Sequence, residues 1–97
     1  MRLQARRAGR SPVLALDGES AVPMYEQIYT AVRDQSVRGA LRPGARVAST
    51  RTLASELAVS RFTVVTALER LVAEGYLTAR RGSGSYVADV LPDHVMR

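Results

Sequence analysis

A short connection between two helical patterns is the strongest constraint on this fold, and it lies within residues 49–88. Ser49 or Thr50 can cap the first helix, which closes at Ala58–Val59, and Ser60 can cap the second. Only two or three residues separate the helices, so they must cross steeply. This pattern predicts a helix-turn-helix.

The second of these helices has one apolar face. A rotation of about 100° per residue, with Val64 pointing inward, divides its residues into two sets. The inner set is Val64, Ala67, Leu68, Leu71 and Gly75. The outer set is Phe62, Thr66, Glu69 and Ala73. In the first helix, Leu53 and Leu57 form the inner face.

Another amphipathic helix precedes this unit. Pro23 suits a first helical turn, and Gly39 supplies the left-handed stop after Arg38. The apolar residues between them are Tyr25, Ile28, Tyr29 and Val32, at i, i+3, i+4 and i+7. This spacing predicts core positions rather than a ligand site. Leu41 and Val47, on either side of a Pro-Gly turn, are predicted to be further core anchors.

Two short β-prone runs follow the helix stop at Glu74–Gly75. Residues 76–79 and 85–88 flank a glycine-containing loop, which predicts a hairpin with Leu77 and Val87 facing the core. The predicted fold class is therefore α+β and mostly helical: a winged helix-turn-helix with three helices and a C-terminal β-hairpin wing.

The remaining segments set the predicted boundaries. Residues 1–11 carry four arginines and no apolar periodicity, so we expect a disordered basic arm. Pro12 to Leu16 is a short apolar run that ends at a turn, and we expect it to form an edge strand. The winged helix domain then spans 12–88. Residues 89–97 are predicted to begin a linker.

Composition narrows the class of partner. The net charge is +5 and the pI about 10.7, and all fourteen basic residues are arginine. This excess favours an anionic partner, although the absence of lysine is also typical of a GC-rich genome. There is no cysteine, and no apolar run approaches the roughly 20 residues that span a bilayer. We therefore expect a soluble, cytoplasmic protein without disulfides and without a membrane partner.

Candidate nucleic-acid contacts begin at the second helix of the pair. Arg61 lies at its amino end, where free N–H groups and the helix dipole attract phosphate, and its guanidinium can also reach a guanine edge. Phe62 points outward, which suits packing on a thymine methyl, burial under the wing or burial by a partner subunit. Thr63 and Thr66 are candidate phosphate donors, or simply residues of a solvated face.

The loop of the hairpin and the start of the preceding helix supply further candidates. Arg80, Arg81 and Gly82 form either a solvated hairpin tip or a wing that places an arginine in a minor groove, where glycine allows close approach. Arg51 is predicted to hold the phosphate backbone and fix register without reading bases. With Ser60 at the helix cap, these residues complete the predicted site.

Nothing in the sequence supports catalysis. His94 is the only histidine, and the carboxylates are spread over the helices as solvating charge. No nucleophile, general base or metal cluster can be assembled from these residues. We expect a protein that is not an enzyme and binds no metal.

The chain resembles the GntR family of bacterial transcription regulators, and within it the MocR-like branch, over about residues 12–88. The motifs, in chain order, are Pro23-Met24-Tyr25-Glu26-Gln27-Ile28-Tyr29, Leu41-Arg42-Pro43-Gly44, Val47-Ala48-Ser49-Thr50-Arg51, Val59-Ser60-Arg61, Leu71-Val72-Ala73-Glu74-Gly75-Tyr76-Leu77 and Arg81-Gly82-Ser83-Gly84-Ser85-Tyr86-Val87. The chain differs from many relatives at Phe62, often a small polar residue, and at Val65, where some members carry arginine.

This resemblance implies a dimeric domain that binds double-stranded DNA through Arg51, Ser60, Arg61, Arg81 and Gly82. It also implies a C-terminal domain that binds pyridoxal phosphate in full-length members. The chain stops before such a domain, so we expect no cofactor in it. A homodimer would place two copies on half-sites roughly 34 Å apart.

A different function stays open for the same fold. A winged helix can serve as a protein interaction or dimerisation module, with Phe62 and the tyrosines as apolar anchors. A convergence of arginines on one side favours DNA. An exposed apolar patch around Phe62 of more than a few hundred Å² favours a protein partner.

Overall fold

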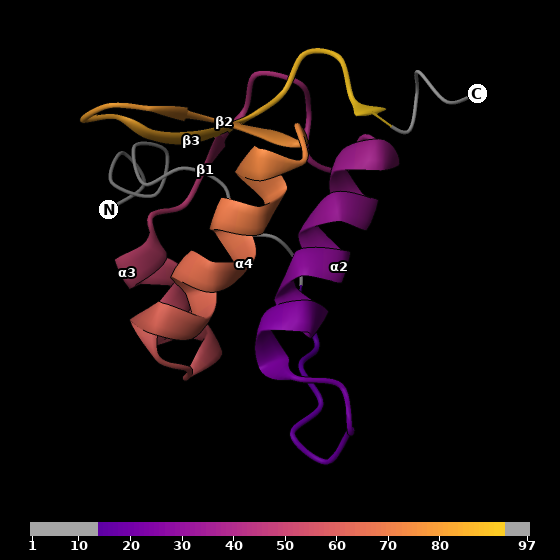
Figure 1. Ribbon diagram of the computed structural model, residues 1–97, viewed down its shortest axis with the longest axis vertical. Coiled ribbons are helices and arrows are strands. Elements are labelled where there is room, and N and C mark those ends of the chain that lie inside the picture. Colours follow the sequence, from indigo (N-terminus) through magenta and orange to yellow (C-terminus); the bar gives the residue numbers. More distant parts are fainter. Residues whose placement is uncertain (1–13, 93–97) are drawn as a thin grey trace.

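The computed structural model describes residues 14–92, so the predicted arm at 1–11 and the tail at 93–97, including His94, lie outside the described residues. The helices of the described range are α2 (Met24–Val37), α3 (Thr50–Leu57) and α4 (Arg61–Ala73), and its strands are β1 (Arg46–Val47), β2 (Leu77–Arg80) and β3 (Gly84–Val87). Figure 1 shows α4 between α3 and α2, with the β2–β3 hairpin projecting beyond the helices. The predicted winged helix-turn-helix is confirmed, although its third strand is β1 and not the expected segment at Pro12 to Leu16.

The inner face of α4 forms the centre of the core. Val64, Ala67 and Leu71 have no exposed surface, and Leu68 is 5% exposed. Only Gly75 departs from the predicted inner set of this helix. It is exposed, because the helix ends at Ala73 and the backbone at Gly75 takes a positive φ of 91°.

The helix α2 packs its apolar stripe on α4. Ile28, Tyr29 and Val32 are buried as predicted, whereas Tyr25 is 38% exposed. The expectation that Tyr25 is a core residue is therefore wrong. Tyr25 lies in the first turn of the helix, at the edge of the packed face, where the i, i+3 spacing still holds but less of the neighbouring structure covers it.

A polar cluster links α2 to the end of α4. The Tyr29 hydroxyl donates to Glu74, and the Arg70 guanidinium lies 3.9 Å above the Tyr29 ring. Arg70 also binds Glu26 at 3.0 Å and Glu74 at 3.2 Å. The hydrogen bond from Tyr29, followed by that from Arg70, holds the pKa of Glu74 below its usual range. These two carboxylates are thus structural rather than only solvating.

The sheet has a strand that the sequence did not reveal. β1 pairs antiparallel with β3, which also pairs with β2, so the order is β1-β3-β2. Arg46 lies opposite Tyr86 and Val47 opposite Ser85. The predicted core anchors Leu41 and Val47 are confirmed at 3% and 1% exposure. A strand of two residues is too short to show a period of two, so the sequence gives no signal for it.

The expected strand at Pro12 to Leu16 is wrong for its described part. Residues 14–16 have no strand geometry, and Leu16 packs against the core from a loop. The Gln27 side chain explains the difference. Its amide accepts from the Asp17 N–H at 2.8 Å and donates to the Asp17 carbonyl at 3.0 Å, which fixes this segment on α2 instead of on the sheet.

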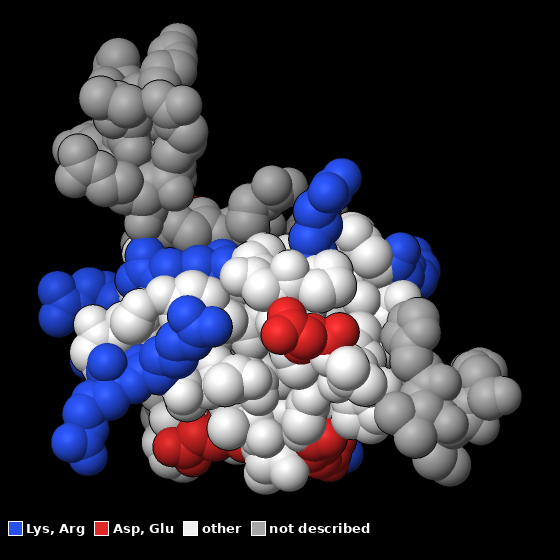
Figure 2. Space-filling view, turned by 90° about the horizontal axis from the view of Figure 1, so that it is seen from above, with Lys and Arg blue, Asp and Glu red and all other residues white. Residues whose placement is uncertain are grey.

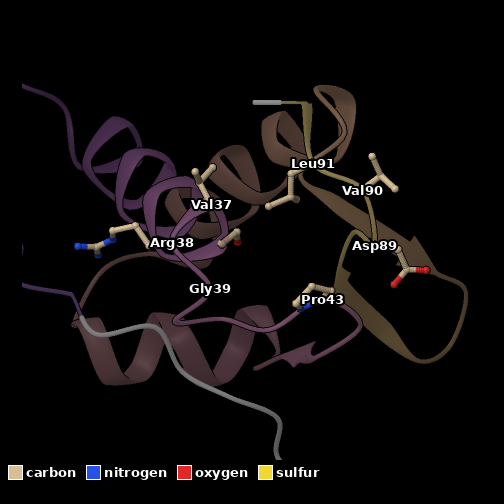
Figure 3. A pocket seen from close by; sticks show the side chains of 8 residues that line it. Val37, Arg38, Gly39, Pro43, Asp89, Val90 and Leu91 are labelled. Carbon is tan, nitrogen blue, oxygen red and sulfur yellow. The ribbon is translucent and has the colours of Figure 1, made fainter. Parts of the chain in front are cut away.

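The packed structure continues past β3 to Leu91. This side chain is 3% exposed and belongs to the core, whereas its neighbour Val90 is 70% exposed. Figure 3 shows Leu91 close to Val37 beside a shallow pocket at the end of α2, which Pro43 and Asp89 also line. The core thus includes a residue that lies beyond the predicted domain end at residue 88.

We expect Leu91→Ala to lower the free energy of unfolding by about 2–4 kcal/mol, because it removes buried apolar surface and leaves a cavity. Val90→Ala is the control, with an expected change within about 0.5 kcal/mol. Urea denaturation of the two variants measures both. Equal effects would show that residues 90 and 91 both belong to a loose tail.

We expect Glu74→Gln to destabilise the protein at pH 7 and to have no effect in acid. A carboxylate with a lowered pKa contributes stability that is present above its unfolded pKa of about 4.3 and is lost as the pH falls through the folded pKa. The expected decrease in the free energy of unfolding is small, because solvent screens the interactions of the half-exposed Glu74. Urea denaturation from pH 7 to pH 3 checks this, with Glu69→Gln on the exposed side of α4 as the control. A difference in the free energy of unfolding between wild type and Glu74→Gln that does not shrink as the pH falls contradicts it.

Candidate nucleic-acid interface

The turn between α3 and α4 sets the direction in which α4 starts. Ala58 closes α3 in the left-handed conformation, with φ 57° and ψ 43°, and the Val59 N–H bonds back to the Ala54 carbonyl at 3.1 Å. Ser60 then returns to extended backbone, with φ −71° and ψ 153°. A single left-handed residue is therefore enough to reverse the chain between the helices.

Both helices of the pair begin with a serine cap. The Ser49 hydroxyl accepts from the Thr52 N–H at 3.1 Å, and the Ser60 hydroxyl accepts from the Thr63 N–H at 3.1 Å. Ser49 is the cap of the first helix, which decides between the two candidates, Ser49 and Thr50. The Ser60 and Thr63 hydroxyls also contact each other at 2.9 Å. These bonds satisfy N–H groups that would otherwise lack partners at each helix start.

The structure brings Arg61 close to the start of α3. Its guanidinium reaches back to the Thr50 hydroxyl, with Nη2 and Oγ1 3.5 Å apart. Arg51 follows Thr50 directly, and both arginines are exposed. Two cations from different helices thus lie at adjacent points of one surface.

Phe62 stands open to solvent beside Arg61. It is 78% exposed, so the wing of this chain does not bury it. The hydroxyl of Thr66, one turn later, donates to the Phe62 carbonyl at 2.8 Å, and Thr66 is half-buried rather than fully outward. Arg61 and Phe62 are therefore more open to an incoming ligand than Thr66.

The wing ends in a tight turn that exposes Arg81 and Gly82. The Ser83 N–H donates to the Arg80 carbonyl at 3.0 Å, and Gly82 has a φ of 75°. A side-chain carbon added at Gly82 would meet nothing within 4 Å. Glycine is needed here for its positive φ, not for space within the chain. The open backbone at this turn permits close approach of a ligand.

Arg80 lies on the sheet rather than at the open tip. Its guanidinium is 4.2 Å from the centroid of the Tyr86 ring, a cation–π distance. The Tyr86 hydroxyl also shares a hydrogen bond with the Ser83 hydroxyl. Arg81 is therefore the more open of the two wing arginines that the sequence singled out.

Arg46 is a residue of this region that the sequence analysis missed. Its Nε donates to the Ser83 carbonyl at 2.9 Å, so it joins β1 to the turn of the wing. No sequence signal marked it, because β1 has only two residues and its pairing with β3 depends on the packed structure.

Charge is unevenly distributed over the molecule. Figure 2 shows several arginines gathered on the side toward which the hairpin projects in Figure 1. Arg70, in contrast, is held by Glu26 and Glu74 on the other side of α4.

Residues 14–92 offer neither a metal site nor a membrane-spanning helix. This part of the chain contains no group of three or more His, Cys, Asp or Glu residues that could hold a metal ion. It also contains no helix long and apolar enough to cross a membrane.

The sequence matches the family described as "Bacterial regulatory proteins, gntR family" over residues 24–87. It is 45% identical over 83 residues to the probable rhizopine catabolism regulatory protein MocR of Rhizobium meliloti. That alignment covers 86% of this chain and 17% of MocR. The chain therefore spans less than a fifth of this relative.

Solved structures give the same picture. YtrA from Sulfolobus acidocaldarius, a GntR-family transcription factor, has a TM-score of 0.72 and 35% identity, covering 79% of this chain and 65% of YtrA. The DNA-binding domain of AraR in complex with operator ORR3 has a TM-score of 0.67 and 29% identity, covering 79% of this chain and 96% of that one. One of these similar structures is thus a domain solved in complex with operator DNA.

We expect Phe62→Ala to change the free energy of unfolding by no more than about 0.5 kcal/mol, because the side chain is mostly exposed. Leu68→Ala on the buried side of the same helix is the comparison and should lose about 2–4 kcal/mol. Urea denaturation measures both. A loss at Phe62 that approaches the loss at Leu68 would mean that Phe62 packs within the chain.

Proposed function

The chain belongs to the GntR family of bacterial regulatory proteins, and from this premise we propose that it binds double-stranded DNA as the operator-binding domain of a transcription regulator. The observation that carries the proposal is the position of Arg61. It lies at the exposed start of α4, within 3.5 Å of the first residue of α3. A free cation at a helix amino end, beside a second helix start, suits an anionic backbone.

In this proposal α4 enters the major groove. Arg61 contacts a guanine edge or a phosphate, and Phe62 packs on a thymine methyl or a sugar. Thr66 contributes an acceptor oxygen to a base edge, because its hydroxyl already donates to the Phe62 carbonyl. Thr63 donates to a phosphate while its oxygen accepts from the Ser60 hydroxyl. Ser60 caps the helix and so orients the N–H groups that face the phosphates.

Arg51 has a positioning role in this proposal. It lies at the start of α3, and its exposed side chain can neutralise a phosphate without reaching a base. The wing adds a contact on the flanking minor groove. Arg81 and Gly82 lie at the open turn, and an arginine inserted there benefits from the negative potential of a narrow groove. Arg80 contributes its charge from the face of the sheet.

Dimerisation and cofactor binding are proposed only for a full-length protein. Two copies on half-sites about 34 Å apart would raise the affinity of a module this small, and regions outside this chain would bring the copies together. Pyridoxal phosphate does not fit this chain. Enzymes hold that cofactor through a lysine amine, and the sequence has no lysine. Any such cofactor would belong to another part of the protein.

The competing interaction-module function is less well supported. Large exposed apolar residues of the described range are Val22, Tyr25, Phe62 and Val90. They lie on different elements: a loop, α2, α4 and the segment after β3. In the chain, Phe62 lies between an arginine and a threonine, Arg61 and Thr63. Single exposed apolar residues are normal on a protein surface and do not require a protein partner.

We expect Arg61→Ala and Arg51→Ala to weaken binding in different ways. Arg61→Ala should reduce affinity for a site selected from a random duplex library by about 5- to 100-fold and affect random DNA much less. Arg51→Ala should weaken both duplexes alike and lower the slope of log K against log salt by about one. Fluorescence anisotropy titrations at several salt concentrations measure these effects.

Arg38→Ala is the control for loss of one positive charge, because Arg38 caps the end of α2, outside the helix-turn-helix and the wing. It should leave both affinities close to wild type. Wild-type affinity that does not decline with salt would overturn the proposed function. Identical profiles for Arg51→Ala and Arg61→Ala would overturn only the division of roles.

A further inference from the structure

Side chains from all three strands meet at the turn of the wing. Arg46 on β1 donates from Nε to the Ser83 carbonyl at 2.9 Å. Tyr86 on β3, opposite Arg46 in the sheet register, shares a hydrogen bond with the Ser83 hydroxyl. Arg80 stacks on the same Tyr86 ring at 4.2 Å. These residues form the wing brace: Arg46, Arg80, Ser83 and Tyr86.

The guanidinium of Arg46 also borders the space beside Gly84 on β3. A side-chain carbon at Gly84 would lie 3.4 Å from Arg46 Nε and 3.6 Å from Nη2. Gly84 itself has a φ of 116°, which other residues rarely adopt. Glycine at this position therefore leaves room for the half-buried Arg46 to reach the Ser83 carbonyl.

We propose that Arg46 is a positioning residue for DNA binding: it fixes the turn at residues 80–83 so that Arg81 and Gly82 face the DNA. This inference rests on the proposed function. Arg46 differs from Arg81 in that it is half-buried and its Nε is bonded to the chain, whereas Arg81 is exposed. The wing brace orders the turn at residues 80–83 in the free protein. A loop that is already ordered loses less conformational entropy on binding.

The brace also connects the wing to the helix-turn-helix. After β1 the chain continues through buried Ala48 to Ser49, which caps α3. Only two residues lie between Val47 and Thr50, the first residue of α3. Arg46 thus fixes the wing tip relative to the helix start that carries Arg51. The distance between the major-groove and minor-groove contacts depends on this link.

A double-mutant cycle on the 97-residue chain tests the proposal with a site selected from a random duplex library. Arg46→Met keeps the stem and removes the hydrogen-bonding fork. It should weaken binding about fivefold in the wild-type background and less than about twofold in the Arg81→Ala background, because the wing has then lost the residue that Arg46 positions. Arg38→Met, with the same loss of charge, should bind as wild type.

Two further measurements separate positioning from charge and from folding. Amide hydrogen exchange at Gly82, Ser83 and Gly84 should speed up in Arg46→Met, while the melting temperature of the domain changes little. Arg46→Lys keeps the charge and can still donate one hydrogen bond. Its affinity and its tip exchange should both fall between those of wild type and Arg46→Met.

Several outcomes would overturn the positioning role. Additive losses for Arg46→Met and Arg81→Ala would mean that Arg46 contacts DNA independently. An unchanged affinity for Arg46→Met would mean that the brace is not used. Wild-type affinity in Arg46→Lys, combined with tip exchange as fast as in Arg46→Met, would assign the effect to charge alone. If wild-type protein binds no DNA, the proposed function fails as well, whereas the other outcomes leave it intact.

Discussion

The rest of the structure depends on the burial of one face of α4. Val64, Ala67 and Leu71 have no exposed surface, and the helix contacts α2, α3 and β2. Removing these side chains from water fixes the rotation of α4 about its own axis, because any turn of the helix would expose some of them. Arg61 and Phe62 face solvent as a direct result. The helix that builds the core is thus also the one that presents the candidate contacts.

Short connections fix the orientation of α4 relative to α3 and to the wing. Two residues, the left-handed Ala58 and Val59, separate the end of α3 from Ser60, which caps α4. On the other side of α3, two residues connect it to β1, and β1 pairs with the wing. Connections this short have little conformational freedom to lose. The starts of both helices and the wing therefore form one rigid surface.

The arginines of the described residues have different physical roles, although each contributes the same formal charge. Arg70 lies between two carboxylates and an aromatic ring and ties α4 to α2. Arg46 and Arg80 contact the wing itself. Arg51, Arg61 and Arg81 are exposed. A net charge therefore indicates the class of partner, whereas burial and bonding decide which cations remain open to it.

The sequence by itself determined the helices, their caps, the hairpin and the inner face of α4, because periodicity, capping and turn formation depend on residues close together in the chain. It also placed arginines at the start of α4 and at the wing. The tertiary structure alone decided β1, the exposure of Tyr25, the burial of Leu91 and the bond from Arg46 to Ser83. Each of these depends on a neighbour distant in sequence: β3 for β1, the core for Leu91, the wing for Arg46. A local sequence pattern cannot predict such a neighbour, because its position depends on how the helices and strands pack against one another.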